Sequence, residues 1–371
     1  MKIGIDARMM GAGNTRGIGR YIEELVRAMI KVAPENEYVL VTRTADHALK
    51  DHDCIKTIVA DIPWYGAKEQ FYLPGILMKL NTDVFHFPHW NVPLAYRRPF
   101  AVTIHDLLLK HQINSSKAST RSWPVRVMKS AGYNACLSHA IKDSRKIFVP
   151  SEFVRDDIIS FYPQCEEKIT VTAEGTNVSV TRDQGTVTRD RTKPYLLYVG
   201  SAYPHKRVDL ILQAWKSIKN DYPDMELRVA GEMDIFMRGI KDGAEAMNLK
   251  GIHFEGKVSE QRLTELYTGA MALLFSSEFE GFGLPPVEAL ASECPVICSD
   301  LRPMTDNLGD EGVIYFKSGS VNGMIQAVKT VVDNSDLMRN QAKKAGEKIK
   351  EKFSWKQTAK ITLEAYKKSL I

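Results

Sequence analysis

Two glutamates in the C-terminal half of the chain, Glu280 and Glu288, stand on either side of a Gly-Phe-Gly bend and a pair of prolines. They belong to the stretch EFEGFGLPPVEAL (278–290), which follows an apolar run typical of a buried strand and leads into a run typical of a helix. Free N–H groups at the start of a helix attract phosphate oxygens. Glu288, expected in the first helical turn, can accept hydrogen bonds from both hydroxyls of a ribose, and Glu280 would face a sugar beyond the phosphates.

The bend between the glutamates suits a bound phosphate. Gly281 and Gly283 permit positive φ and a close approach of the backbone to a ligand. Pro286 suits the first position of a helix, where its missing N–H does no harm. We therefore expect the backbone of Gly281, Phe282, Gly283 and Leu284 to contact phosphate and sugar. The alternative for this stretch is a capped helix with two solvated glutamates.

A positive charge is expected near the same place. Lys206 follows the apolar run YLLYVGS (195–201) after a short loop, and Arg207 stands beside it. A lysine at this position can neutralise the charge that develops on a diphosphate leaving group. The alternative is that both cations belong to a surface loop.

The elements that must position these residues follow a regular rhythm. Short apolar runs alternate with helical patterns, which implies parallel strands joined by crossover helices. Strands are predicted at 2–7, 38–43, 83–88, 100–106, 146–151, 195–201, 225–231, 251–258, 271–277, 295–300 and 313–316. Helices are predicted between most of them, among others at 19–33 and 121–142, and at the end of the chain. The polar stretch 180–194 interrupts the rhythm and predicts a linker.

The sequence therefore predicts an α/β protein with two Rossmann-like, doubly wound domains that face a deep cleft. We place the first domain at 1–185, the second at 192–352, and a final helix at 353–371 that packs back toward the first domain. In such domains ligands bind beyond the carboxyl ends of the strands, where the candidate residues stand.

Composition narrows the class of protein. With 371 residues the chain is too long for one ordinary core, and its hydrophobic content of 44% is usual for a globular protein. No apolar run approaches the ~18 residues of a membrane-spanning helix, and the start of the chain lacks the zones of a secretion signal. The five scattered cysteines fit a reducing compartment, so we expect a cytoplasmic protein.

Positive charge is concentrated between residues 107 and 146. This segment has eight Lys and Arg residues but one acidic residue, Asp143, and apolar residues are interleaved with the basic ones. This pattern predicts a surface that rests on anionic lipid at the inner face of the membrane or meets an anionic acceptor. The alternative is a solvated helical face. Nucleic acid is not expected as a partner, because no nucleic-acid-binding motif accompanies the charge.

Taken in order, several segments resemble retaining glycosyltransferases of family 4 (glycosyl transferases group 1), which have the GT-B fold. The stretch EGFGLPPVEAL resembles the paired-glutamate signature of this family. The other matching segments are GIDARMM, GIGRYIEEL, HFPHWNVP, VTIHDLL, YVGSAYPHKRVDLILQAW and FSWKQTA. The variants GIGRY and PHKRVDL are most similar to mannosyltransferase-type members that build bacterial polysaccharides from GDP-mannose.

The resemblance implies an enzyme that transfers a hexose from a nucleotide-diphosphate sugar to a glycan or lipid-linked acceptor with retention of configuration. The second domain would bind the donor, with Lys206 and Glu280 acting in catalysis and Glu288 on the ribose. Ser201 stands where family members often carry an arginine, so Arg207 is expected to supply the second positive charge. Val258, at the end of a predicted strand, completes the expected donor site.

The first domain would bind the acceptor. His105 and Asp106 end a predicted strand, and the resemblance places His105 beside the reacting sugar, with a role in catalysis. Gly17 and Gly19 lie in a loop expected to aim backbone N–H groups into the cleft. Trp64, in an aromatic connection, could line an acceptor groove; aromatic packing within a loop is the alternative.

Other classes of function compete with this prediction. The loop with Gly17 and Gly19 resembles a dinucleotide fingerprint, but Ile22 stands where its third glycine belongs, which disfavours an oxidoreductase. A nucleotide-sugar epimerase of the same fold and a non-catalytic nucleotide-sugar sensor remain as alternatives. We expect no cofactor and no metal ion, because cations and helix N-termini can take the phosphate charge; the pair of aspartates at 51–53 is expected to be solvated.

Overall fold

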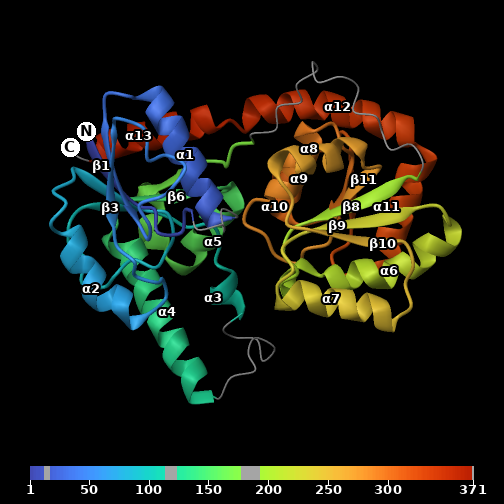
Figure 1. The fold of residues 1–371 in the computed structure, drawn as a ribbon, viewed down its shortest axis with the longest axis horizontal. Coiled ribbons are helices and arrows are strands. Elements are labelled where there is room, and N and C mark those ends of the chain that lie inside the picture. The colour runs from blue at the N-terminus through green and yellow to red at the C-terminus, as the bar shows by residue number, and fades with distance from the viewer. Residues whose placement is uncertain (12–16, 113–122, 177–192, 370–371) are drawn as a thin grey trace. The chain divides into compact units, whose positions relative to one another are not determined.

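The structure is a computed structural model of the whole chain, and it describes residues 1–11, 17–112, 123–176 and 193–369. The predicted linker at 180–194 lies almost entirely outside the described residues. The chain divides into two compact units. Unit 1 comprises Met1–Gly175 and Trp355–Ile371, and unit 2 comprises Thr176–Ser354. Each unit has one parallel sheet with helices on both faces (Figure 1), which confirms the predicted α/β class.

The sheet of unit 1 has seven parallel strands in the order β3-β2-β1-β4-β5-β6-β7. The strands are β1 (Lys2–Asp6), β2 (Glu37–Thr42), β3 (Ile55–Val59), β4 (Val84–Phe87), β5 (Phe100–Thr103), β6 (Lys146–Val149) and β7 (Ile169–Val171). The helices are α1 (Ile18–Val32), α2 (Ala67–Leu77), α3 (Leu108–Gln112), α4 (Trp123–Asp143), α5 (Glu152–Phe161), the 3₁₀ helix η1 (Pro163–Lys168) and α13 (Trp355–Ser369). The edge strands β3 and β7 were not predicted.

Alternate residues of each strand face opposite sides of this sheet, so unit 1 has two apolar layers. On one face, Ile3 and Ile5 of β1 pack with α1 and α13. On the other, Phe85 and Phe87 of β4 pack with α2, α4 and α5. Period-two alternation in strands and period-3.6 alternation in helices produce this division.

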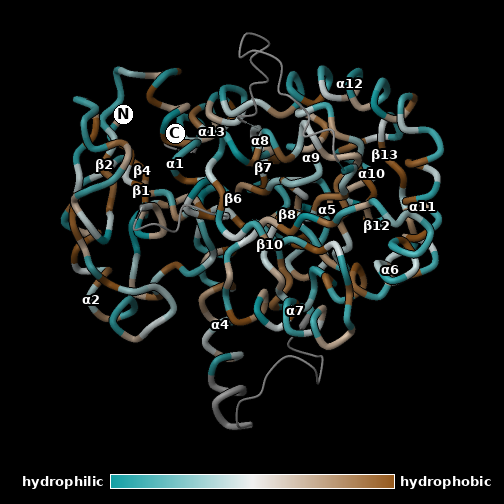
Figure 2. Tube along the Cα trace, turned by 45° about the vertical axis from the view of Figure 1, so that its right-hand side comes forward, coloured by the Kyte–Doolittle hydropathy of each residue, from teal (hydrophilic) through white to brown (hydrophobic). Residues whose placement is uncertain are grey.

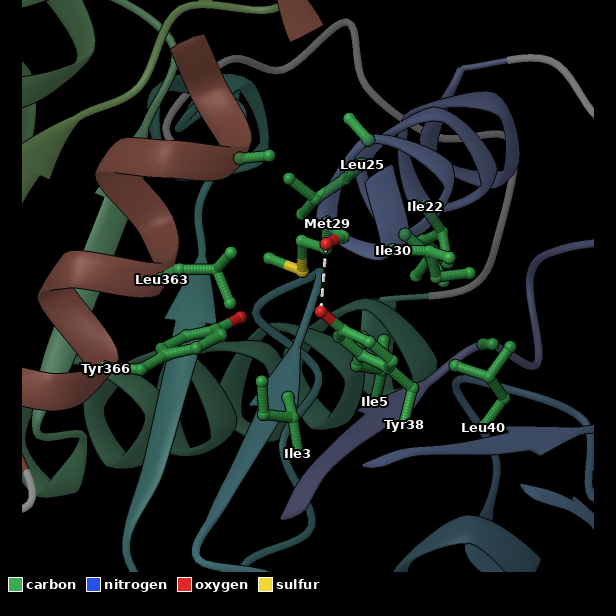
Figure 3. Close-up of a cluster of buried hydrophobic side chains, with 14 of the residues drawn as sticks. Ile3, Ile5, Ile22, Leu25, Met29, Ile30, Tyr38, Leu40, Leu363 and Tyr366 are labelled. Carbon is green, nitrogen blue, oxygen red and sulfur yellow. Dashed lines mark hydrogen bonds between the residues drawn. The ribbon is translucent and has the colours of Figure 1, made fainter. Parts of the chain in front are cut away.

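Figure 3 shows how α13, from the far end of the chain, completes the first layer. Leu363 and Tyr366 of α13 point toward Met29 and Leu25 of α1 over the strands. The Tyr38 hydroxyl donates to the Met29 carbonyl at 3.0 Å, which fixes β2 to α1. Tyr366 also contacts His86 of β4, with its hydroxyl 2.6 Å from Nδ1. The last helix therefore belongs to the core of unit 1.

The sheet of unit 2 has six parallel strands in the order β10-β9-β8-β11-β12-β13. The strands are β8 (Tyr195–Val199), β9 (Glu226–Ala230), β10 (Ile252–Gly256), β11 (Ala272–Phe275), β12 (Val296–Ser299) and β13 (Val313–Phe316). The helices are the 3₁₀ helix η2 (Pro204–Lys206), α6 (Val208–Asp221), α7 (Ile235–Ala246), α8 (Glu260–Gly269), α9 (Leu284–Ala291), α10 (Arg302–Leu308), α11 (Val321–Asp333) and α12 (Ser335–Lys352). Figure 1 shows α6 and α7 on one side of this sheet and α8 and α9 on the other.

In unit 2, as in unit 1, the helices bury their apolar residues against the sheet. Trp215 of α6 is fully buried among residues of β8, β9 and α11. The outer helix α12 is predominantly hydrophilic in Figure 2, and only one stripe of it, including Ala342 and Ile349, is buried.

In each sheet the strand order reverses at one point. In unit 1 the chain first builds outward on one side of β1 and then continues from β4 on the other, so the order reverses between β1 and β4. In unit 2 the reversal lies between β8 and β11. Ligands of open α/β sheets bind beyond the carboxyl ends of the strands at such a reversal. A ligand site is therefore expected at these two points.

Candidate active site

In unit 2, the loops that follow β8 and β11 are bound to each other at the reversal of strand order. The Glu278 N–H donates to the His205 carbonyl at 2.8 Å. The Ser276 hydroxyl contacts the carbonyls of Lys206 and Arg207 at 2.8 and 2.9 Å. These bonds hold the start of the EFEGFG stretch against η2, so residues some 70 positions apart in sequence share one small region.

The central contact there is an ion pair between Lys206 and Glu280. Lys206 Nζ donates to Glu280 Oε1 at 2.6 Å, and the two side chains are 19% and 12% exposed. Lys206 Nζ also lies 5.8 Å from the centroid of the Phe275 ring. The structure thus brings together two residues that the sequence analysis placed in catalysis, and it leaves them within reach of solvent.

Arg207 lies next to this pair but is bound to other carboxylates. Its backbone is left-handed (φ 49), and it ends η2. Its Nε donates to Asp209 Oδ1 at 3.0 Å, and its Nη1 contacts Glu278. The hydrogen bond to Asp209 is the largest cause that raises the pKa of Arg207 above its ordinary value. Its charge is therefore largely balanced within unit 2.

The backbone of Ser201 joins the same region. The Tyr198 hydroxyl donates to the Ser201 carbonyl at 2.6 Å. Tyr198 is buried, which raises the pKa of its hydroxyl well above the ordinary value, and the nearby charge of Glu280 adds to this effect. Tyr198 thus stays a neutral donor that fixes the turn after β8.

The Gly-Phe-Gly bend enters α9 earlier than predicted. Gly283 is left-handed (φ 86), and the helix begins at Leu284, not near Pro286. Pro285 and Pro286 carry no N–H, so among the first three helical residues only Leu284 offers one. The expectation of several free N–H groups at this helix start was therefore wrong. The rest of the bend is fixed: Asn307 donates to the Phe282 carbonyl at 2.9 Å, and the Phe282 ring is buried edge-on against Phe353.

Glu288 is not a solvated carboxylate. Because α9 begins at Leu284, Glu288 occupies the fifth helical position and lies in the second turn, not the first. It is 3% exposed, and the Tyr267 hydroxyl of α8 donates to its Oε2 at 3.2 Å. A buried carboxylate needs hydrogen-bond donors, and Tyr267 supplies one.

Val258 lies after β10 and just before Ser259, the N-cap of α8. Since β9 lies between β10 and β8 in the sheet, Val258 is two strands away from Lys206 along the same sheet edge. The structure does not bring Val258 into contact with the ion pair.

In unit 1, His105 follows β5 and has an acceptor at each ring nitrogen. Nδ1 lies 3.1 Å from Glu174 Oε1, and Nε2 lies 3.1 Å from the Pro88 carbonyl. The Tyr21 ring meets the His105 ring edge-on at 4.7 Å. The Pro88 carbonyl can only accept, so Nε2 is the ring nitrogen that donates to it, and Nδ1 faces the Glu174 carboxylate. Glu174 was not predicted, because it lies three residues after the edge strand β7, which was itself not predicted.

Asp106 has a local structural contact. Its Oδ1 accepts from the Leu108 N–H at 2.8 Å, which caps the short helix α3. Gly17 precedes α1 with a positive φ of 57°, and Gly19 is buried in the first turn of that helix. Residues 12–16 of the glycine loop lie outside the described residues.

Trp64 lies beneath Arg43, whose guanidinium is 5.5 Å from the centroid of the tryptophan ring. Its neighbour Tyr65 instead faces the residues after β4, and its ring stacks on Trp90 with centroids 5.5 Å apart. The aromatic residue that the structure brings to the reversal of strand order is thus Tyr65 rather than Trp64.

A buried ionic network that the sequence analysis missed lies at the same reversal. Arg8 follows β1 and contacts Asp6 at 2.7 Å and Glu69 of α2 at 2.5 Å. The side chains of Arg8 and Glu69 are each 1% exposed. Asn91, after β4, donates to the same Glu69 oxygen at 2.7 Å, so the network joins the ends of both strands. The segment DAR after a strand was its only sequence signal.

Metal binding finds no support among the described residues, where no group of three or more His, Cys, Asp and Glu side chains is placed to hold an ion. The aspartates at 51–53 are exposed, as expected. Within the same described part of the chain, no helix combines the length and apolar character needed to cross a bilayer.

Comparison with known proteins supplies the context for this geometry. Residues 15–180 match the family model described as Glycosyltransferase Family 4, and residues 180–349 match the one described as Glycosyl transferases group 1. The O-antigen chain mannosyltransferase RfbU of Salmonella typhimurium is 27% identical over 276 residues, which cover 74% of this chain and 72% of that protein. The O-antigen chain mannosyltransferase B of Escherichia coli is 24% identical over 387 residues, which cover 95% of this chain and 96% of that protein.

A solved structure of sucrose-phosphate synthase from Thermosynechococcus elongatus aligns with a TM-score of 0.76, covering 99% of this chain and 98% of that chain at 18% identity. At this level of identity the likeness concerns the fold. It agrees with the two parallel-sheet units and confirms the predicted GT-B class.

Proposed function

Because the chain belongs to glycosyltransferase family 4, with a glycosyl transferases group 1 domain in its C-terminal half, we propose a specific transfer reaction for it. The donor is GDP-mannose, the transferred hexose is mannose, and its anomeric configuration is retained. The acceptor is a glycan or lipid-linked glycan in polysaccharide or cell-envelope assembly. Two O-antigen chain mannosyltransferases among the relatives support the choice of sugar and pathway class.

The observation that carries this proposal is the Lys206–Glu280 ion pair at the reversal of strand order in unit 2. A lysine that is only partly exposed is a strong partner for a diphosphate, because little water screens it. A diphosphate that reaches Lys206 competes with Glu280, which is then released toward the sugar. The pair thus couples donor binding to the placement of a carboxylate beside the reacting carbon.

In the proposed reaction, the bond between the anomeric carbon and the diphosphate oxygen breaks as the acceptor oxygen bonds to that carbon from the same face. The acceptor hydroxyl loses its proton to an oxygen of the leaving diphosphate. Lys206 stabilises the negative charge that develops on this group. No metal ion or other cofactor enters this scheme.

Glu288 is proposed to bind the ribose of the donor. It is held by Tyr267, so its orientation is fixed before a ligand arrives. The backbone of Gly281 and of Leu284 is proposed to contact the phosphates, with Ser201 and Val258 at the margin of the donor site. Arg207 acts by placing Glu278 and the start of α6 rather than as a free cation.

Unit 1 is proposed to bind the acceptor. His105, oriented by Glu174 and the Pro88 carbonyl, contacts the reacting sugar. Gly17, Gly19 and Asp106 shape the loops at the same sheet edge. Retention of configuration is part of this proposal.

A peripheral position at an anionic membrane surface is also proposed. Of the basic residues at 107–146, the side chains of Lys129, Lys142 and Arg145 are exposed, whereas those of 112–128 lie outside the described residues. Helix α2 adds Phe71 and Tyr72, which are both exposed. Co-sedimentation with phosphatidylglycerol vesicles, but not with phosphatidylcholine vesicles, is the expected result.

The proposed reaction is tested by a donor panel. The protein is incubated with GDP-mannose, UDP-glucose or ADP-glucose, and thermal shift reports nucleotide binding because a ligand of the folded state raises its stability. Release of nucleotide is then measured with and without a mannose-terminated oligosaccharide, and the product anomer is determined by NMR. Nucleotide release only on addition of the oligosaccharide supports a transferase. An epimerase would convert the donor without it, and a sensor would bind the donor and release nothing.

A further inference from the structure

Three aromatic side chains form a small surface at the reversal of strand order in unit 1, which we term the aromatic shelf: Tyr65, His89 and Trp90. The Tyr65 ring is stacked on Trp90, with an interplanar angle of 25°, and the His89 ring lies 4.9 Å from Trp90. The Tyr133 ring also meets Trp90 edge-on, with centroids 4.6 Å apart. Tyr65 is 55% exposed, so the shelf presents aromatic surface to solvent.

The backbone of Tyr65 is held in an unfavourable conformation. Its φ is 61°, a left-handed value that is uncommon for a bulky residue. Such conformations persist only where the surroundings impose them, and they cluster at ligand sites. Here the Tyr65 N–H donates to Glu69 Oε2 at 2.9 Å. The carboxylate that binds Arg8 therefore also fixes the exposed aromatic residue.

The same network fixes His89. Asn91 Nδ2 donates to Glu69, so Asn91 Oδ1 faces His89 Nδ1 at 2.8 Å as an acceptor. Nδ1 must then carry the hydrogen, and Nε2 is the ring nitrogen that can accept. Burial lowers the pKa of His89 to about 3, which keeps the ring neutral at physiological pH. The Tyr65 hydroxyl lies 3.5 Å from this Nε2, at the long end of hydrogen-bond distance, so a sugar hydroxyl that approaches closer can replace it as the donor.

A buried ionic network is costly, and replacing one with apolar side chains is often neutral or stabilising. Arg8, Asp6, Glu69 and Asn91 instead hold two loops in one geometry, and both loops end in the aromatic shelf. The network thus preorganises a surface, as a binding site requires.

We propose that the aromatic shelf binds one hexopyranose ring of the acceptor glycan. The ring would stack its C–H face on Tyr65, and one hydroxyl would donate to His89 Nε2. An amphipathic aromatic side chain with a polar group at its margin matches a sugar, which has an apolar face and a rim of hydroxyls. This assignment rests on the proposed function, since it supposes that the acceptor is a glycan and that unit 1 binds it.

The test measures sugar binding without catalysis. Methyl α-D-mannopyranoside is titrated into the full-length protein, and its dissociation constant is determined by saturation-transfer NMR. The variants are Tyr65→Asn, which removes the ring but tolerates a left-handed backbone, and Tyr65→Phe, which keeps the ring. Tyr72→Ala is the matched control, because Tyr72 is an exposed aromatic residue of α2 outside the shelf. Tyr65→Gly serves as a second ring-deletion variant should Tyr65→Asn fold poorly.

We expect millimolar binding by the native protein, at least fivefold weaker binding by Tyr65→Asn, and unchanged binding by Tyr65→Phe and Tyr72→Ala. Three outcomes would overturn the assignment of the aromatic shelf as a sugar site. The first is native-like binding by Tyr65→Asn, and the second is an equal loss of binding in Tyr65→Asn and Tyr72→Ala. The third is absence of binding by the native protein at tens of millimolar sugar. Stabilisation by GDP is measured on the same samples and should be equal in all of them. Absence of GDP binding by the native protein would instead contradict the proposed function, so the two failures are distinguishable.

Discussion

The two reversals of strand order in this protein carry the same kinds of charge in different surroundings. In unit 2, Lys206 and Glu280 form a pair that solvent reaches. In unit 1, Arg8 pairs directly with Asp6 and Glu69, and the side chains of Arg8 and Glu69 are each 1% exposed. An anion can displace Glu280 from Lys206 at modest cost, whereas displacing the partners of Arg8 would leave buried charges uncompensated. Under the proposed function, the same fold thus uses one cation to bind the donor and another to hold loops in place.

Removal of the buried cation of unit 1 should have the largest effect on stability. Arg8→Met leaves Asp6 and Glu69 buried without their partner, and we expect the free energy of unfolding of unit 1 to fall by about 3–5 kcal/mol. Urea unfolding followed by circular dichroism measures it. Arg43→Met is the matched control: Arg43 pairs with exposed Asp61, so it should change stability by less than about 1 kcal/mol. Equal effects of the two variants would contradict the distinction drawn here.

Removal of the cation of unit 2, Lys206, should reduce activity more than stability. Lys206→Ala should reduce kcat of sugar transfer by about 10²–10³-fold, the range seen when one group that stabilises transition-state charge is removed. The free energy of unfolding should fall less than in Arg8→Met, because the Lys206 and Glu280 side chains are 19% and 12% exposed whereas those of Arg8 and Glu69 are each 1% exposed. Lys216→Ala, on an exposed position of α6, provides the control for loss of a positive charge. A large loss of stability with unchanged kcat would assign Lys206 to structure.

A smaller effect is expected at the buried carboxylate of α9. Glu288→Gln keeps the shape of the side chain but removes its charge, and a hydrogen bond to a charged group contributes about 1.5–3 kcal/mol. We therefore expect the dissociation constant for GDP to rise at least tenfold in isothermal titration. Tyr267→Phe removes one internal donor to Glu288 and leaves its charge in place, so it should weaken binding less. GDP affinity that does not respond to Glu288→Gln would remove this residue from the donor site.

The sequence predicts the fold better than the site, for identifiable reasons. The central strands are continuous apolar runs because parallel sheets are buried on both faces, so β1 and β8 are recognised at once. The edge strand β3 reads IKTIV and leaves Val59 exposed, which weakens its signal. Within the site, the order of the chain shows that Lys206 and Glu280 both follow strands, but their contact depends on the pairing of β8 with β11. The Arg8–Glu69 pair joins residues 61 positions apart, and only the folded unit shows it.

The smallest expected effect is a loss of stability at low pH, which should arise in unit 1 rather than in unit 2. Burial lowers the pKa of His86 to about 3, and the charge of His105 acts in the same direction. His86 is enclosed by Thr103 and Tyr366, whereas the described histidines of unit 2, His205 and His253, are not buried. Between pH 6.5 and about 3 the unfolded chain binds a proton at His86 that the folded unit does not, so stability is lost as the pH falls.

Proton binding at His86 can change the free energy of unfolding by at most about 1.4 kcal/mol per pH unit. Urea unfolding of the native protein and of His86→Gln at pH 7, 6 and 5 measures it. The variant should lose stability at pH 7 through its altered hydrogen bonds, yet show a shallower fall between pH 6 and 5. Parallel pH profiles for the two proteins would mean that His86 binds its proton equally in both states, and the acid sensitivity of unit 1 would then have to come from His89 or from the carboxylates around Arg8.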